Sequence, residues 1–240
     1  MGSTPAPHYR PDIDGLRAFA VTAVVAFHGA PGLLPGGFLG VDVFFVISGY
    51  LISGLVLAEV RAGSFSITTF YLRRARRILP ALLLMLFVVS LLALLVLMPV
   101  ELWNFANELI ASVAFVPNLA MLGDVGYFDT LAYTKPLLHL WSLGVEEQFY
   151  LVWPIALALI ARRDRPVHLA LWIAALAALS FVIHLVIYRQ SPQASFYLPV
   201  TRFWELLIGA LLAAAAARAK PLADDRWRGM RSATSALESC

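Results

Sequence analysis

The chain has 240 residues, of which 60% are hydrophobic and 14% are charged. Its mean hydropathy is +0.79, whereas a soluble domain carries about 25% charged and 45–50% apolar residues. The composition excludes an ordinary soluble domain and predicts an all-α bundle of transmembrane helices. The net charge of +3 is too small to indicate nucleic-acid binding. The single cysteine, Cys240, leaves no disulfide framework, cysteine nucleophile or zinc site.

Hydrophobic segments of spanning length recur along the chain, since a transmembrane helix needs about 20 mostly apolar residues. Six segments fit: 15–35, 38–60, 78–99, 140–161, 167–188 and 199–218. A seventh apolar stretch, 104–122, is broken by polar residues and a proline, so we interpret it as interfacial or re-entrant. Residues 1–218 are therefore expected to form one membrane domain. Residues 219–240 are polar without apolar periodicity, and we expect a disordered cytoplasmic tail there.

The basic residues predict how the helices are oriented, because Lys and Arg cluster in loops that stay in the cytoplasm. Three loops are basic: Arg73, Arg74, Arg76 and Arg77; then Arg162, Arg163 and Arg165; then Arg218, Lys220, Arg226, Arg228 and Arg231. With six spans these loops lie on one face together with the N-terminus. A seventh full span would place the second loop on the opposite face. The charge pattern thus predicts that both termini are cytoplasmic.

Ionisable residues inside a membrane are costly and usually functional, and the first predicted span contains Asp14, Arg17 and His28. Eleven residues at about 100° each bring Arg17 and His28 within about 20° on one helix face, roughly 16 Å apart. Asp14 lies within about 40° of that stripe. His28 is a candidate general base, because an imidazole titrates near working pH. Alternatively, Asp14 and Arg17 anchor the helix at the interface and His28 is a hydrogen-bonded packing residue.

The next loop and span add Gly36, Gly37 and Asp42. The glycines allow either a plain short turn or a close approach of the backbone to a ligand. Asp42 stands near the outer end of an apolar helix. There it either pairs with a cation and shapes a polar cavity, or is a solvated helix end.

Four arginines, Arg73, Arg74, Arg76 and Arg77, stand just before the third predicted span. Guanidinium groups grip phosphate oxygens bidentately, so the cluster suits a cytosolic acyl donor of nucleotide type. The topology rule alone also explains arginines at this position.

The later spans contain Glu146, Glu147, Arg202 and Glu205. Glu146 and Glu147 point about 100° apart on a helix, so we do not expect them to share one partner face. One is then functional and one structural, or they only neutralise a membrane arginine. Arg202 and Glu205 are three residues apart, which favours a pair with each other or with the glutamates of the fourth span.

Several stretches carry a family resemblance, and they occur in the family's order. They are YRPDIDGLRAFAV (9–21), His28, GGFLGVDVFFVISGYLI (36–52), FYLRRARRILP (70–80), PLLHLWSLGVEEQFYLVWP (136–154) and RFWEL (202–206). Together they resemble acyltransferase family 3, membrane proteins that acylate lipopolysaccharide O-antigen, exopolysaccharide, peptidoglycan, macrolide or related acceptors. The resemblance covers roughly residues 9–218.

The resemblance implies a multi-pass protein of the bacterial inner membrane that takes an acyl group, commonly acetyl, from acyl-coenzyme A. The acceptor would be a glycan or a lipid-linked sugar among membrane lipids, with no permanently bound cofactor, metal or nucleic acid. His28 matches the family's essential histidine, as base or acyl relay, and we group Glu146 and Glu147 with it as catalytic. Arg17 matches the first-helix arginine, and we group it with Arg73 to Arg77 as donor-binding. Gly36 and Gly37 match the glycine pair.

The arginine cluster matches the family's Arg-x-x-Arg motif, either as Arg73 with Arg76 or as Arg74 with Arg77. Members usually have about ten spans, so we expect this chain to be a truncated member. Two other readings remain. One is a transporter or flippase of lipid-linked sugars or acyl groups, since intramembrane His, Glu and Arg also suit proton coupling. The other is an inactive membrane protein.

Overall fold

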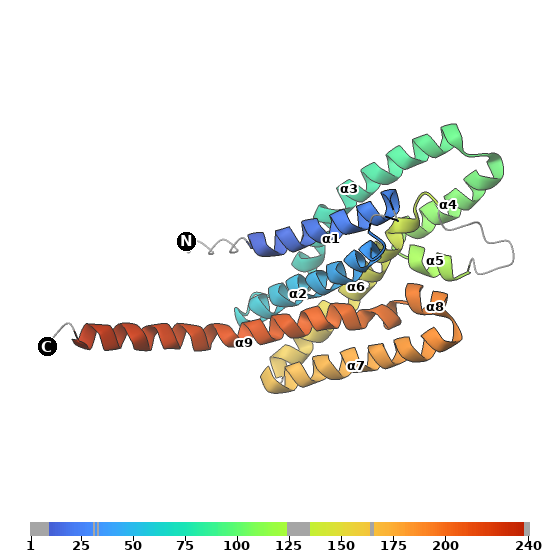
Figure 1. The fold of residues 1–240 in the computed structure, drawn as a ribbon. Coiled ribbons are helices and arrows are strands. Elements are labelled where there is room, and N and C mark those ends of the chain that lie inside the picture. Colours follow the sequence, from blue (N-terminus) through green and yellow to red (C-terminus); the bar gives the residue numbers. More distant parts are fainter. Residues whose placement is uncertain (1–9, 31, 33, 124–134, 164–165, 238–240) are drawn as a thin grey trace.

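The structure is a computed structural model that describes residues 10–237 except 31, 33, 124–134 and 164–165. The described residues form helices joined by short connections, which confirms the all-α prediction (Figure 1). The elements are α1 (Pro11–Gly29), the 3-10 helix η1 (Gly37–Leu39), α2 (Gly40–Arg61), α3 (Ile67–Val96), α4 (Pro99–Val113), α5 (Pro117–Gly123), the 3-10 helix η3 (Leu138–Leu140), α6 (Trp141–Arg163), α7 (Pro166–Gln190), α8 (Pro192–Tyr197) and α9 (Pro199–Leu237).

Five helical stretches are long and apolar enough to cross a membrane. They are Gly37–Arg61, Ile67–Val96, Leu138–Arg162, Val167–Gln190 and Pro199–Ala219. They confirm five of the predicted spans, although the third begins at Ile67 rather than at residue 78. The arginine cluster is therefore inside α3 and not before it. Helix α1 is not among the five: it has 19 residues and ends at Gly29, short of the predicted end of the span at residue 35. Its first two turns carry Asp12, Asp14 and Arg17, which lower its hydropathy.

The apolar stretch 104–122 is divided between two short helices, α4 and α5. The break lies at Phe115, whose φ of 57° is left-handed and unusual for a side chain with a Cβ. Pro117 follows and lacks a backbone donor. Neither helix is long enough to span a membrane, which agrees with the prediction that this stretch is not a full span. Figure 1 shows α4 folding back beside the end of α3.

Helix α9 continues through the segment that the sequence predicted to be a disordered tail, as far as Leu237. The backbone over 219–237 is helical, whereas 238–240 lie outside the described residues. The assignment of this tail to the cytoplasm stays a prediction.

Glycines let α2 pack directly against its neighbours. A Cβ on Gly49 would lie 1.9 Å from the Leu206 carbonyl oxygen of α9, and one on Gly209 would lie 2.0 Å from the Val46 oxygen of α2. Small residues allow such close backbone contact between membrane helices. A Cβ on Gly37 would likewise lie 2.3 Å from the Ala23 oxygen of α1, so this glycine serves helix packing.

Helices α1 and α9 respectively begin and end on the same side of the bundle (Figure 1). The start of α3 and the end of α6 also lie on that side, so the basic segments share one face as the charge pattern predicts. Arg165, which belongs to one of them, lies outside the described residues. The assignment of that face to the cytoplasm stays a prediction.

Candidate active site

A cavity of about 290 Å³ lies where the end of α1 meets the starting ends of α2, α6 and α9. Its wall combines apolar and aromatic side chains with three polar ones. The lining residues are Val24, Phe27, His28, Phe38, Val41, Asp42, Leu138, Trp141, Phe196, Tyr197 and Arg202. A small, mostly apolar cavity with a few convergent polar groups is the usual form of a ligand site. Three of the residues predicted from sequence, His28, Asp42 and Arg202, are brought together here.

His28 stands in the last turn of α1 and is exposed at the cavity rim. Its Nδ1 lies 2.8 Å from the Val24 carbonyl oxygen. A carbonyl only accepts hydrogen bonds, so Nδ1 carries a proton, and in the neutral ring Nε2 is then the nitrogen with a lone pair for another donor. Arg17 also faces α2, with its guanidinium carbon 5.4 Å from the centre of the Phe44 ring. The two residues therefore share a helix face, as their spacing predicts.

Arg202 of α9 is held by two carboxylates. It bonds to Asp42 at the start of α2, and its Nη1 lies 3.0 Å from Oε1 of Glu205. Its side chain is 9% exposed, and the rings of Trp141 and Phe196 lie 5.8 and 5.5 Å from its guanidinium carbon. The predicted pair of Arg202 with Glu205 is confirmed. Asp42 was predicted either to pair with a cation or to be a solvated helix end, and it pairs with Arg202.

A second buried cluster surrounds Arg74 of α3. Its Nη2 lies 3.1 Å from Glu147 and 3.6 Å from Glu146, both on α6. Its guanidinium carbon lies 3.7 Å from the centre of the Tyr150 ring. The prediction that the adjacent glutamates do not share a partner is wrong. Their Cβ directions diverge, but the flexible side chains converge on one guanidinium, whose several N–H groups serve both.

Glu146 is further bonded by its own neighbours. The Tyr150 hydroxyl donates to its Oε1 at 2.5 Å, and the Ser48 hydroxyl of α2 donates to the same atom. Ser48 and Tyr150 were not singled out from the sequence. The spacing of four residues between Glu146 and Tyr150 places them on one helix face and was the available signal, whereas the Ser48 contact joins residues 98 apart in the chain.

The four arginines of α3 do not form one cluster. Arg73 bonds to Glu59 of α2 at 2.5 Å, and Arg74 points into the bundle. Arg76 and Arg77 are exposed, and no carboxylate among the described residues forms an ion pair with them. Of the five predicted donor-binding residues, which include Arg17, two are thus already paired with carboxylates.

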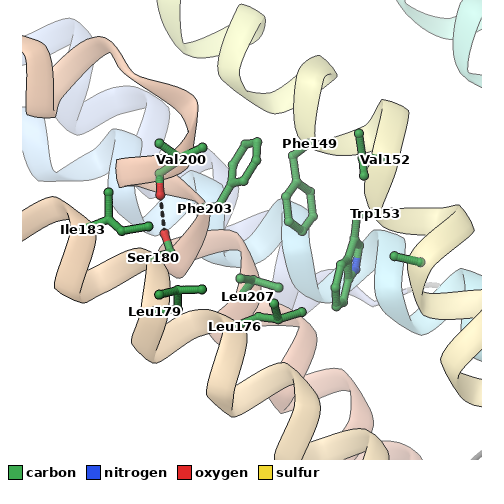
Figure 2. Close-up of a pocket in the computed structure, with 11 residues that line it drawn as sticks. Phe149, Val152, Trp153, Leu176, Leu179, Ser180, Ile183, Val200, Phe203 and Leu207 are labelled. Carbon is green, nitrogen blue, oxygen red and sulfur yellow. Dashed lines mark hydrogen bonds between the residues drawn. The ribbon is translucent and has the colours of Figure 1, made fainter.

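Two other predicted residues are away from these contacts. Asp14 is exposed on α1, and a Cβ on Gly36 would meet nothing within 4 Å. A larger hollow of about 370 Å³ lies among α6, α7 and α9, and Figure 2 shows its apolar lining. Its one hydroxyl, on Ser180, donates to the Val200 oxygen at 2.6 Å. That hollow presents no group for acid–base chemistry.

Membrane-spanning helices that hold two arginines paired with carboxylates, with an imidazole at the rim of the adjoining cavity, define a polytopic membrane protein with a polar interior site. The chain matches the acyltransferase domain of the acyltransferase 3 family over residues 10–238, and it belongs to that family.

Similar proteins include O-acetyltransferase OatA of Staphylococcus aureus (strain NCTC 8325 / PS 47), 38% identical over 212 residues, which are 87% of this chain and 35% of the relative. Peptidoglycan O-acetyltransferase OatA of Listeria monocytogenes serovar 1/2a is 40% identical over 210 residues, 85% of this chain and 34% of the relative. The chain thus spans about a third of the length of these relatives. No solved structure matches it.

Proposed function

We propose that this domain transfers an acyl group, most simply acetyl, from acyl-coenzyme A to a hydroxyl of a cell-surface glycan. The observation that carries the proposal is His28, at the rim of the cavity with Nε2 available as a proton acceptor. Relatives named O-acetyltransferases support the acetyl group. Among the acceptor classes implied by the family resemblance, the name of the Listeria relative favours peptidoglycan.

In the proposed step, Nε2 of His28 takes the proton of the acceptor hydroxyl while its oxygen attacks the thioester carbonyl. A new C–O ester bond forms and the C–S bond breaks, so coenzyme A leaves as its thiolate and is then protonated. General base catalysis of this kind contributes about 10²–10⁴-fold to a rate. Relay of the acyl group through the imidazole is the alternative order, and it also requires a neutral ring at Nε2.

The donor phosphates are assigned to the exposed arginines of α3. Arg76 and Arg77 are available to a ligand, whereas Arg74 is neutralised by two carboxylates within the bundle. Charge-assisted contacts from such forks suit phosphate oxygens. In this arrangement the basic face is cytoplasmic in the inner membrane, and Arg17 lies between the donor end of the bundle and His28 on α1.

The experiment follows labelled acetyl from acetyl-coenzyme A into alkali-labile esters of peptidoglycan, using membranes that contain the chain. We expect labelling with the native chain and its loss in His28→Ala. His168→Ala, which changes an exposed histidine of α7, is the matched control and should label normally. Equal labelling by native protein and His28→Ala would remove the role assigned to His28. No labelling by the native chain would contradict the activity proposed for it.

A further inference from the structure

The cavity beside His28 has aromatic walls from two different parts of the chain. Phe27 of α1 and Phe38 of η1 form one pair, with ring centres 5.7 Å apart and an edge-to-face arrangement. Trp141 of α6 and Phe196 of α8 form the other, with ring centres 4.4 Å apart. The rings of Phe38 and Phe196 are 50% and 39% exposed, so they are open to a ligand.

Polar side chains line the same cavity as these aromatic rings. His28, Asp42 and Arg202 all line the same cavity. Arg202 donates a hydrogen bond to Asp42 and forms an ion pair with Glu205, yet its buried Nε and both carboxylate oxygens of Glu205 have no hydrogen-bond partner among the described residues. A buried donor without a partner is costly, so an additional acceptor oxygen near this guanidinium is favourable.

The charge of the cavity argues against the nucleotide end of the donor. Arg202 carries one positive charge, and Asp42 and Glu205 carry two negative charges when ionised. A polyphosphate placed there would find a guanidinium that is already paired with carboxylates, and so little net positive charge to bind it. The volume, about 290 Å³, is at the small end of the range of about 300–1,000 Å³ found for ligand sites and suits a single ring.

We infer that this cavity is the acceptor subsite and binds one pyranose ring of the glycan between the two aromatic pairs, with a hydroxyl directed to His28. The inference rests on the proposed function. A pyranose ring presents C–H groups on its faces and hydroxyls at its rim. The negative faces of aromatic rings attract the C–H groups, while Asp42, Arg202 and His28 supply donors and acceptors for the rim.

A binding measurement tests the subsite without any transfer reaction. The probe is methyl N-acetyl-β-glucosaminide, observed by saturation-transfer NMR with the full chain in detergent micelles, and its open-chain alditol is the comparison ligand. We expect saturation of the ring C–H protons of the glycoside but not of the alditol. Phe196→Ala should weaken the glycoside about three- to tenfold, since an aromatic contact contributes that much, and Phe196→Tyr should restore it.

Phe19→Ala is the matched control, because Phe19 is a 72% exposed phenylalanine of α1 that does not line the cavity. If Phe196→Ala lowers the thermal midpoint, Phe38→Ala tests the opposite wall. No saturation of the glycoside by the native chain, equal saturation of the alditol, or native binding by both cavity variants would each overturn the inference.

Kinetics separate this inference from the proposed function. In the labelled acetyl assay, Phe196→Ala should raise KM for the glycan acceptor about three- to tenfold and leave KM for acetyl-coenzyme A unchanged. A rise in the donor KM alone would mean that the cavity holds the donor's pantetheine arm and would overturn the acceptor subsite. Ring binding without acetyl transfer would support the subsite and contradict the proposed function.

Discussion

Among the described residues, Arg202 is buried and Arg74 is half-buried, and each of the two is paired with two carboxylates. Arg202 pairs with Asp42 and Glu205 beside an aromatic cavity. Arg74 pairs with Glu146 and Glu147, with Tyr150 beneath its guanidinium. The charges are similar, but only the first cluster lies beside an imidazole that has a free ring nitrogen.

The two clusters are close along the bundle. Asp42 and Ser48 belong to the same helix, six residues apart, which is about 9 Å along its axis. In the Arg74 cluster, the hydroxyls of Ser48 and Tyr150 both donate to Glu146, so the protein's own side chains occupy that carboxylate. A buried ion pair in this membrane domain is therefore not by itself a reactive site. We assign a structural role to Arg74 and the chemistry to the cavity beside His28.

Breaking the Arg74 cluster should have the largest effect on folding. In Arg74→Leu, two carboxylates remain buried without their cation, and removal of one partner from a buried ion network costs about 3–5 kcal/mol. We expect a large drop in the thermal midpoint in detergent micelles. Arg76→Leu, at an exposed position two residues further along α3, is the control and should keep the native midpoint. A native midpoint for Arg74→Leu would show that the cluster does not hold the helices together.

Removing one hydroxyl from the same cluster should have a smaller effect. Tyr150→Phe keeps the ring under Arg74 but deletes the hydrogen bond to Glu146. A hydrogen bond to a charged group contributes about 1.5–3 kcal/mol. We expect a moderate loss of thermal stability with unchanged KM values in the transfer assay. A specific rise in donor KM would instead give this cluster a binding role and would weaken the contrast with the cavity.

Changing the exposed arginines should affect donor binding and not stability. The double change Arg76→Gln and Arg77→Gln is expected to raise KM for acetyl-coenzyme A about tenfold, since it removes charge-assisted contacts to phosphate. Arg162→Gln, an exposed cation at the end of α6 on the same side, is the control. If the double variant keeps its donor KM but inverts in the membrane, as measured by cysteine labelling from each side, the arginines serve topology only.

The smallest effect concerns an exposed ion pair, which contrasts with both buried clusters. Arg10 donates hydrogen bonds to Asp12 and lowers the pKa of that carboxyl to about 2. The folded pKa lies below the unfolded value of about 3.9. The pair thus contributes fully above pH 4, and its contribution is lost as the pH falls toward 2. Asp12→Asn should remove this small dependence of the thermal midpoint on acidic pH. Solvent screening keeps the effect small.

Local spacing predicted the contacts that are local in the chain. Arg202 and Glu205 are one helical turn apart, and Arg17 and His28 share a face by periodicity, so both relations followed from helix geometry. The contact of Asp42 with Arg202 joins residues 160 apart. It depends on how α2 and α9 pack through Gly49 and Gly209, which no local pattern specifies.

The contacts that the sequence did not predict also depend on residues far apart in the chain. Cβ directions alone separated Glu146 from Glu147, but Arg74 approaches from another helix and meets both. The aromatic ring of Phe196 stands in a six-residue helix without a distinctive pattern, so its place in the cavity needed the fold. The arginines of α3 looked like a single unit because sequence proximity does not show which carboxylates face each of them.

The central claim is that the cavity beside His28 is the reactive site and that the Arg74 cluster is structural. The most direct measurement compares the acetyl-transfer rate and the thermal midpoint of His28→Gln and Arg74→Leu with those of the native chain. For His28→Gln we predict that the transfer rate falls by at least about 10²-fold while the thermal midpoint stays native. For Arg74→Leu we predict a lowered thermal midpoint. A native transfer rate in His28→Gln would contradict the account.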